Sequence, residues 1–371
     1  MHKMTATGTI LEHELSEVRL LVERQTGIVL DCPNSALAAH VAECVEKQQM
    51  GSSTAWLEAL RAAEQDPSTL PQLLDGLINT NTGFFRHPGA MNALTQQVLP
   101  LLQARKSADG ASPLRIWSVG CSSGEEAYSV AIAVCEAMGG TGSASAGTSG
   151  GAASQEAGNR SNGDAKEKNG GARNGGIAEA SSVVSAQPGS SAGPVHIVGS
   201  DLLPSNIEVA DRGVYPQSAV AGLAPATIRA YFSKIAPNAR SLAARQKEGA
   251  TMGSDTDPDA RANPDGRAGN VQLLVKARLR SLVTFNCMNL ARPGYIGRFD
   301  CILCMDVLPH FSRAQRGALL ERLHLYLEPG GYLFLSQTEK LVAPNLNFRS
   351  ETFDGYTFHR KPLAASAAYG R

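Results

Sequence analysis

The chain has 371 residues, of which 43% are hydrophobic, so it is long enough for two domains, each with its own core. Its 34 basic residues balance 34 acidic ones, and a formal net charge of zero gives no general attraction to nucleic acid or to an anionic membrane. No apolar run approaches the roughly 20 residues that cross a bilayer, and the first residues lack the apolar core of a secretory signal. We therefore expect a cytoplasmic protein without membrane insertion.

Residues 10–78 show helical patterning, because apolar residues recur every three or four positions in four segments. Ser35, Ser53 and Ser68 stand where helix N-caps are expected. A further helix over about 92–104 leads into the next part of the chain. The pattern predicts an N-terminal helical domain over residues 1–86 and a second domain over residues 87–371.

Residues 114–134 predict a strand, a glycine loop and a helix. Gly120 and Gly124 bound a tight turn that lets the backbone approach a ligand, and the helix that follows presents unpaired N–H groups. A phosphate-binding loop would have Lys and Ser or Thr where Glu125 and Glu126 stand, so a pyrophosphate is disfavoured. The ligand should be neutral or cationic, and S-adenosylmethionine fits because it carries a sulfonium, an ammonium group and ribose hydroxyls.

Two polar tracts interrupt the second domain. Residues 139–194 and 237–270 are dominated by small and polar residues and bury too little apolar area to offset the entropy of ordering, so we expect disorder there. The second tract lies within an expected small β-subdomain, residues 231–282.

Strands and helices alternate along the rest of the second domain. The expected strands are 194–201, 279–290, 298–308 and 332–339, the expected helices are 204–215 and 312–327, and a hairpin is expected over 351–361. This order predicts an α/β fold with a doubly wound, Rossmann-like parallel sheet, whose ligands bind at the carboxyl ends of the strands. Cys301 and Cys304 lie three apart in one strand and therefore on opposite faces, so we expect no metal or redox site there. The seven cysteines suggest reduced thiols rather than disulfide bonds.

Seven segments occur in a characteristic order: NTNTGFFRHP, WSVGCSSGEEAYS, GSDLLPSNIEVADRGVYP, YF, LRSLVTFNCMNL, FDCILCMDVLPHF and LEPGGYLFLSQTE. In this the chain resembles the CheR family of chemotaxis-type protein-glutamate O-methyltransferases. The resemblance covers most of the chain outside the polar tracts. It implies a helical domain packed on a class I methyltransferase domain with a small β-subdomain, and S-adenosyl-L-methionine bound between the two domains.

The resemblance also implies roles for individual residues. Arg86 would pair with the carboxylate of the cofactor, Asp201 would accept hydrogen bonds from its ribose, and Asn289 with Leu290 would contact its adenine. Arg86 and His310 are the expected catalytic residues. The expected cofactor-binding residues are Thr80, Thr82, Arg86, Gly120, Glu125, Glu126, Asp201, Asn289, Leu290, Met305 and Asp306.

Structural alternatives stay open for several of these residues. Glu126 could complement the dipole at the start of a helix, and Asp201 could cap a turn. Asn289 and Leu290 could simply end a strand, and His310 could be an ordinary loop histidine.

The chain departs from the family pattern at a few positions. Met305 and Asp306 replace an Arg-Asn pair, which makes the site more acidic by about two charges and weakens its attraction for a carboxylate. His310 replaces a tyrosine and could titrate near neutrality. Thr80 stands where the family commonly has asparagine.

The expected activity is methyl transfer to glutamate side chains of a chemoreceptor cytoplasmic domain or other protein substrate by a monomeric enzyme without metal. A glutamate carboxylate is already ionised at pH 7, so its attack on the methyl group needs no general base. Residues 1–86 hold six Lys and Arg but eleven Asp and Glu, which disfavours an acidic receptor. Two alternatives remain open: a catalytically weak CheR-like scaffold or sensor that binds S-adenosylmethionine or S-adenosylhomocysteine, and a methyltransferase that acts on a small molecule or another target.

Overall fold

The structure is a computed structural model. It describes residues 10–78, 81–108, 112–139, 195–235 and 271–363, except 293, 295, 296, 342 and 344. The predicted disorder of the two polar tracts falls almost wholly outside these residues, as does Thr80. No helix in these ranges is long and apolar enough to cross a membrane.

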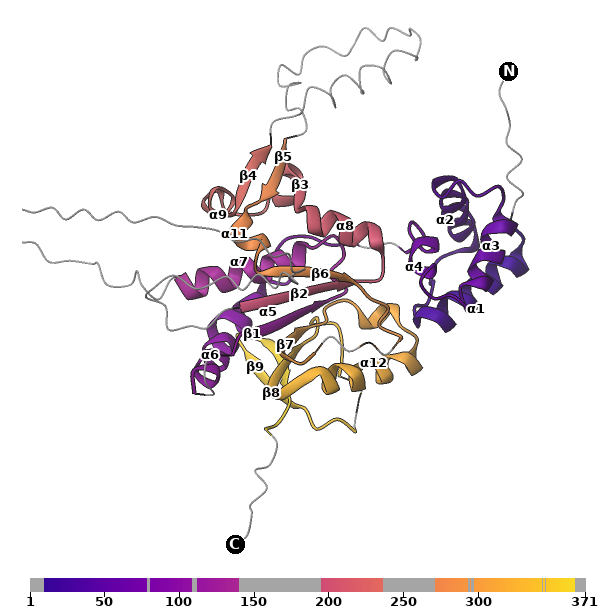
Figure 1. Ribbon diagram of the computed structural model, residues 1–371. Helices are drawn as coiled ribbons and strands as arrows, with labels where there is room; N and C mark the ends of the chain where they lie inside the picture. Colours follow the sequence, from indigo (N-terminus) through magenta and orange to yellow (C-terminus); the bar gives the residue numbers. More distant parts are fainter. Residues whose placement is uncertain are drawn as a thin grey trace, which may run out of the picture.

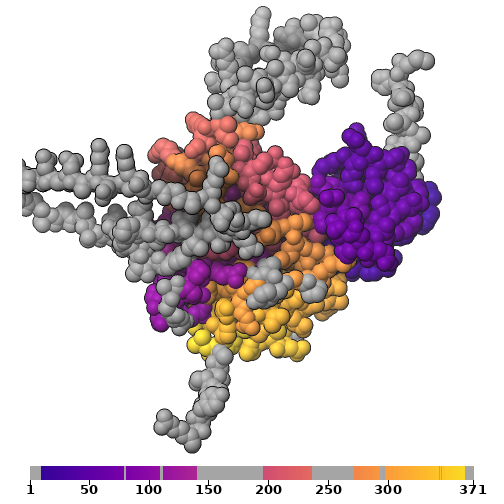
Figure 2. Space-filling view, in the orientation of Figure 1, coloured from indigo at the N-terminus to yellow at the C-terminus, as the bar shows by residue number. Residues whose placement is uncertain are grey.

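The N-terminal part is helical, as predicted. Its buried apolar side chains form one cluster, which also takes in Leu203 from the second domain. Figure 1 shows these helices to one side of the sheet, and the same residues form a lobe at one side of the molecule in Figure 2. The predicted N-caps are wrong, because Ser52 rather than Ser53 accepts the N–H of Ala55. The helices are α1 (Glu12–Thr26), α2 (Asn34–Lys47), α3 (Ser53–Ala62) and α4 (Leu70–Leu73).

The other two predicted caps are also wrong, for a different reason. Ser35 lies inside α2, whose N-cap is Pro33, and Ser68 precedes Thr69, the N-cap of α4. Both helices begin without a side-chain cap hydrogen bond. Packing of their apolar faces, rather than capping, therefore fixes where they start.

The second domain is built on a seven-stranded sheet in the order β6-β2-β1-β7-β8-β10-β9. The first five strands in this order run parallel, and β10 pairs antiparallel with both β8 and β9. This confirms the α/β fold class and the final hairpin. The strands are β1 (Leu114–Val119), β2 (Val195–Asp201), β6 (Val283–Cys287), β7 (Phe299–Leu303), β8 (Leu327–Phe334), β9 (Arg349–Phe353) and β10 (Tyr356–Arg360).

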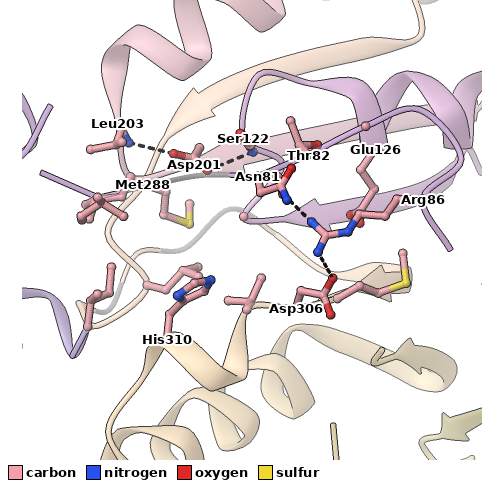
Figure 3. A pocket seen from close by; sticks show the side chains of 18 of the residues that line it. Asn81, Thr82, Arg86, Ser122, Glu126, Asp201, Leu203, Met288, Asp306 and His310 are labelled. Atoms are coloured by element: carbon pink, nitrogen blue, oxygen red, sulfur yellow. Dashed lines mark hydrogen bonds and ion pairs between the residues drawn. The ribbon is translucent and has the colours of Figure 1, made fainter. Parts of the chain in front are cut away.

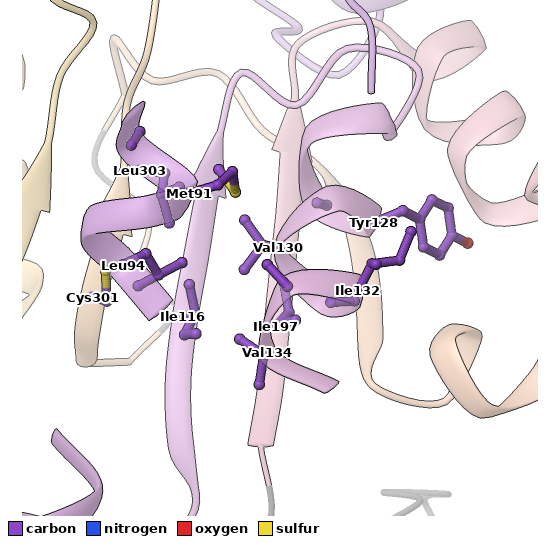
Figure 4. Packing of buried hydrophobic residues seen from close by; sticks show 14 of the residues in the cluster. Met91, Leu94, Ile116, Tyr128, Val130, Ile132, Val134, Ile197, Cys301 and Leu303 are labelled. Atoms are coloured by element: carbon purple, nitrogen blue, oxygen red, sulfur yellow. The ribbon is translucent and has the colours of Figure 1, made fainter. Parts of the chain in front are cut away.

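Helices cover both faces of this sheet. On one face, Val130 and Val134 of α7 pack toward Ile116 and Ile197 of the neighbouring strands (Figure 4). On the other, α12 covers a second cluster. The helices are α5 (Pro88–Ala93), a π-helical turn (Leu94–Val98), α6 (Leu99–Ala108), α7 (Glu125–Gly139), α8 (Pro204–Arg212) and α12 (Arg313–Tyr326).

The two cysteines of β7 and its end belong to different faces. Cys301 packs in the α7 cluster and Cys304 in the α12 cluster, and both are buried. This agrees with the expectation that residues three apart in a strand point to opposite sides. A shared site for the two thiols would need them on one side.

A small antiparallel sheet, in the order β3-β5-β4, stands beside the main one. Its strands are β3 (Val214–Pro216), β4 (Phe232–Ile235) and β5 (Gln272–Val275), accompanied by α9 (Pro225–Tyr231), α11 (Ala277–Arg280) and a 3-10 turn (Gln217–Val220). The expected subdomain, residues 231–282, left out β3. The predicted helix 204–215 in fact ends at Arg212, because the next residues pair with β5.

The two domains meet at the carboxyl edge of the main sheet. Ile28, just after α1, forms an antiparallel bridge with Phe311. Val29 N–H donates to the carbonyl of His310 at 2.8 Å, and Asn289 Nδ2 donates to the carbonyl of Gln25 at 2.9 Å. These bonds hold the end of α1 against the segments that follow β6 and β7.

The start of α7 tolerates no side chain at Gly124, which has a φ of +94°. A Cβ there would lie 2.7 Å from Ala210 Cβ and 3.0 Å from its Cα, so Gly124→Ala should lower the free energy of unfolding by about 1–3 kcal/mol or more. Gly317 of α12 is the control, because a Cβ there meets nothing within 4 Å and Gly317→Ala should stabilise by about 0.5–1 kcal/mol. Urea unfolding of both variants measures the difference, and equal stabilities would contradict the packing described.

Candidate functional site

A cavity of about 420 Å³ lies at the carboxyl edge of the sheet, between the two domains. This volume is within the range of small-molecule sites. Thr26 and Ile28 contribute its wall from the N-terminal domain, and residues 81–83 and 85–87 line it from the segment between the domains. The remaining wall comes from the glycine loop and from the segments after β2, β6 and β7 (Figure 3).

Most of the residues predicted for the site come together here. The described ones that line the cavity are Thr82, Arg86, Gly120, Glu126, Asp201, Asn289, Leu290, Met305, Asp306 and His310. Glu125 does not line it, because its buried carboxylate instead accepts a 2.7 Å hydrogen bond from Ser123 Oγ. Thr80 lies outside the described residues, so its role stays a prediction.

Asp201 ends β2 and is only 8% exposed. Its Oδ2 accepts the backbone N–H of Ser122 at 3.0 Å, and its Oδ1 accepts Leu203 N–H and Asn206 Nδ2, each at 3.0 Å. A carboxylate has about four acceptor positions, so one remains for a ligand. Asp201 therefore has the turn role left open by the sequence and keeps one acceptor position for a hydroxyl.

The glycine loop and the segment after β7 approach each other closely. Gly120 has a φ of +66°, and a Cβ on it would lie 2.7 Å from Val307 Cγ2. Only glycine lets Val307 pack this closely against the loop. This contact fixes the distance between two walls of the cavity.

Arg86 is held by an ion pair. Its Nη2 lies 3.1 Å from Asp306 Oδ2, and its Nη1 donates to the carbonyl of Asn81 (Figure 3). His87 Nε2 lies 3.0 Å from the same Asp306 oxygen. Asp306 itself has a φ of +59°, a left-handed conformation that Asp and Asn tolerate better than most residues. The guanidinium is thus already paired with a carboxylate of the chain itself.

Asn289 and His310 have structural roles as well as places at the cavity. The Asn289 amide is engaged on both sides, since Nδ2 donates to Gln25 and Oδ1 accepts Ala291 N–H at 2.9 Å. His310 lies in the short 3-10 turn Leu308–His310, with an exposed side chain at the cavity. Its backbone carbonyl carries the contact to the N-terminal domain.

Sequence reasoning missed several residues of the site. Glu339, just beyond β8, accepts the backbone N–H groups of Asp306 at 3.2 Å, Leu308 at 2.9 Å and Ser336 at 2.7 Å. Burial raises the pKa of its carboxyl. Its place a few residues after the carboxyl end of β8, the last parallel strand in the chain, was the available signal. The N-terminal wall residues Thr26 and Ile28 had no such signal, because they come from a different domain.

Glu126 is the most perturbed acid at the cavity. Burial, with smaller contributions from Asp306 and Glu339, raises the pKa of Glu126 to about 8, although Ser118 Oγ donates to its carboxyl at 2.7 Å. A carboxyl with such a pKa is largely protonated at neutral pH. Deprotonation, favoured by a nearby cation, would make it an acceptor for a positively charged ligand.

This raised pKa predicts a pH dependence of stability. A carboxyl whose pKa rises on folding contributes stability that is complete below its unfolded value of 4.5 and is lost as the pH rises through about 8. Glu126→Gln should remove this fall in the free energy of unfolding, which one proton limits to about 1.4 kcal/mol per pH unit. Urea unfolding of wild type and variant across this pH range tests it, and parallel pH curves would show that Glu126 is not perturbed.

The residues present fit S-adenosylmethionine. Carboxyl groups outnumber cations at the cavity, which suits a sulfonium and an ammonium group, and Asp201 keeps an acceptor position for a ribose hydroxyl. Ser122 Oγ is buried and has no hydrogen-bond partner among the described residues, as expected of a group that awaits a ligand. Leu290, Met288 and Leu203 add apolar surface for a base.

The chain is similar to known methyltransferases. The family described as CheR methyltransferase, SAM binding domain, matches residues 80–147 and 262–356. Chemotaxis protein methyltransferase 1 of Pseudomonas aeruginosa is 27% identical over 325 residues, which cover 87% of this chain and 88% of that protein. Chemotaxis protein methyltransferase of Vibrio parahaemolyticus is 24% identical over 343 residues, or 92% and 93% of the two chains.

Among solved structures, magnesium protoporphyrin IX methyltransferase from Synechocystis with bound SAM is 13% identical, covers 76% of this chain and 84% of its own, and has a TM-score of 0.27. That likeness is too low to bear on function. The family match and the two chemotaxis relatives agree on the kind of protein that the chain resembles. The chain is similar to the CheR methyltransferase family over residues 80–147 and 262–356, and its cofactor is S-adenosylmethionine.

Proposed function

We propose that this methyltransferase acts on glutamate side chains of a chemoreceptor cytoplasmic domain and produces glutamyl methyl esters. The observation that carries the proposal is the cavity between the domains, where Arg86 stands among several carboxyl groups. A guanidinium there can bind an acceptor carboxylate, and the acidic surroundings suit a cationic methyl donor. The names of the two curated relatives, both chemotaxis protein methyltransferases, support the same kind of target.

The chain contributes binding and orientation. When bound, S-adenosylmethionine supplies the reactive methyl group. Asp201 would hold a ribose hydroxyl with its remaining acceptor position, and Arg86 would orient the acceptor carboxylate. Apolar side chains such as Phe311 and Met305 exclude water from the cavity, which leaves the carboxylate less solvated. No residue has to remove a proton, because glutamate is ionised at neutral pH.

One observation favours a second function, cofactor binding with little turnover. Arg86 is paired with Asp306 and bonded to Asn81, so an incoming carboxylate has to compete for it. If that competition fails, the protein would bind S-adenosylmethionine or S-adenosylhomocysteine as a sensor or scaffold. The two functions share one cavity and differ in whether methyl esters form.

The decisive assay supplies methyl-labelled S-adenosylmethionine and purified chemoreceptor cytoplasmic domains. We expect label on the receptor that mild base releases as methanol, since esters are base-labile and methylated amines are not. Arg86→Gln should lower the rate by about 100-fold through loss of acceptor alignment. A receptor domain whose candidate glutamates are changed to alanine is the control. Tight binding of S-adenosylhomocysteine without any ester would instead support the scaffold.

Asp306→Asn should make a better enzyme for an acidic acceptor. Asparagine tolerates the left-handed backbone at this position, so the substitution removes the competing charge with little strain. We expect the KM for the receptor domain to fall about two- to fivefold at saturating cofactor. Asp354→Asn is the matched control, because Asp354 has a φ of +48° and is exposed in the β9–β10 hairpin, outside the cavity lining. An unchanged or higher KM in Asp306→Asn would refute the competition.

A further inference from the structure

Glu339 accepts backbone N–H groups at the point where two central strands, β7 and β8, separate. The β7–β8 pairing runs as far as Cys304, whose N–H donates to the carbonyl of Phe334 at 2.9 Å. Beyond it, the chain after β7 turns under the cavity while the chain after β8 continues to Ser336. The side chain of Glu339 accepts one backbone N–H from the second segment and two from the first. It therefore ties the two segments together where the backbone ladder stops.

The tied segment is the wall of the cavity. Residues 305–307, 310 and 311 all line it, and Leu308 lies between them. Glu339 Oε2 accepts the N–H of Asp306, the residue whose φ of +59° is unusual for a side chain with a Cβ. Glu339 Oε1 accepts the N–H of Leu308 on the other side of Val307. These two bonds bracket Val307, which packs on Gly120 of the glycine loop.

The geometry reaches Arg86 through Asp306. With its backbone held by Glu339, the Asp306 carboxylate lies within 3.1 Å of Arg86 Nη2 and 3.0 Å of His87 Nε2. A different backbone conformation at Asp306 would carry this carboxylate away from the guanidinium. Glu339 thus controls where the charges of the cavity lie without lining the cavity itself.

We propose that Glu339 is a positioning residue: its carboxylate fixes the Asp306–Leu308 turn and thereby the Arg86–Asp306 pair that the cofactor meets. This proposal rests on the cofactor site alone and not on the identity of the methyl acceptor. It adds to the proposed function a residue that acts on the same cavity through the backbone of Asp306 and Leu308. A glutamine at 339 has one acceptor oxygen, so it keeps part of the bond set, and an alanine keeps none.

Calorimetry with S-adenosylhomocysteine tests the proposal in the full chain. We expect Glu339→Gln to raise the Kd about three- to tenfold and Glu339→Ala to raise it further, because lost hydrogen bonds loosen the turn. Hydrogen exchange should quicken in residues 304–311 and stay unchanged in β1 and β2. Glu321→Gln, an exposed carboxylate on α12, is the control and should leave the Kd unchanged.

A double-mutant cycle separates positioning from a general loss of stability. If Glu339 acts through Asp306, then Glu339→Gln should change the Kd clearly in the wild-type background and by less than about twofold in an Asp306→Asn background. Equal effects in the two backgrounds would overturn the proposal, as would an unchanged Kd in both Glu339 variants. Failure of both variants to fold would also overturn it, because the carboxylate would then serve the fold. None of these measurements depends on ester formation. A failure of the proposed function would therefore show in the receptor assay and not here.

Discussion

The carboxylate of Asp201 is the interaction on which the rest of the site depends. It accepts an N–H from the glycine loop at Ser122 and another from Leu203 at the start of α8. Leu203 in turn packs into the core of the N-terminal domain. One side chain at the end of one strand thus sets the loop after β1, the helix after β2 and part of the contact between the domains. A ligand that bonds Asp201 contacts the point where all three meet.

The charges of the cavity favour a cationic ligand. Burial raises the pKa of both Glu126 and Glu339, which means that the site resists carrying all its negative charges at once. A bound cation relieves that resistance, so a positively charged donor is favoured over a neutral one. The same balance works against an anionic acceptor, for which Arg86 is already engaged with Asp306. For the proposed carboxylate acceptor, binding of donor and acceptor would be coupled, because the positive charge of the donor offsets the negative charge of the acceptor.

The sequence predicted what depends on local pattern. The strand, loop and helix around Gly120 and Gly124 follow from apolar periodicity interrupted by glycine, whereas the role of Asp201 came from the family resemblance. The direction of Glu125 could not be predicted, since neighbouring acids at a helix start point to different sides and Ser123 captures one of them. Pairing of Arg86 with Asp306 joins positions 220 apart in the chain, and no periodicity encodes such a contact.

The family resemblance predicted more site residues than the apolar pattern did. It gives no guidance where this chain differs from the family. Where the family has Arg-Asn, this chain places Met305 and Asp306, and a backbone held in the left-handed region suits either Asn or Asp at the second position. Asp306 therefore meets the need for a left-handed backbone, while the net charge of the residue pair changes from positive to negative. In the proposed reaction, methyl transfer from a sulfonium to a carboxylate neutralises both charges, so a cavity that excludes water would favour the transition state over the separated ions. If the acceptor is a carboxylate, as proposed, the departure changes the binding of the acceptor rather than the chemistry that follows.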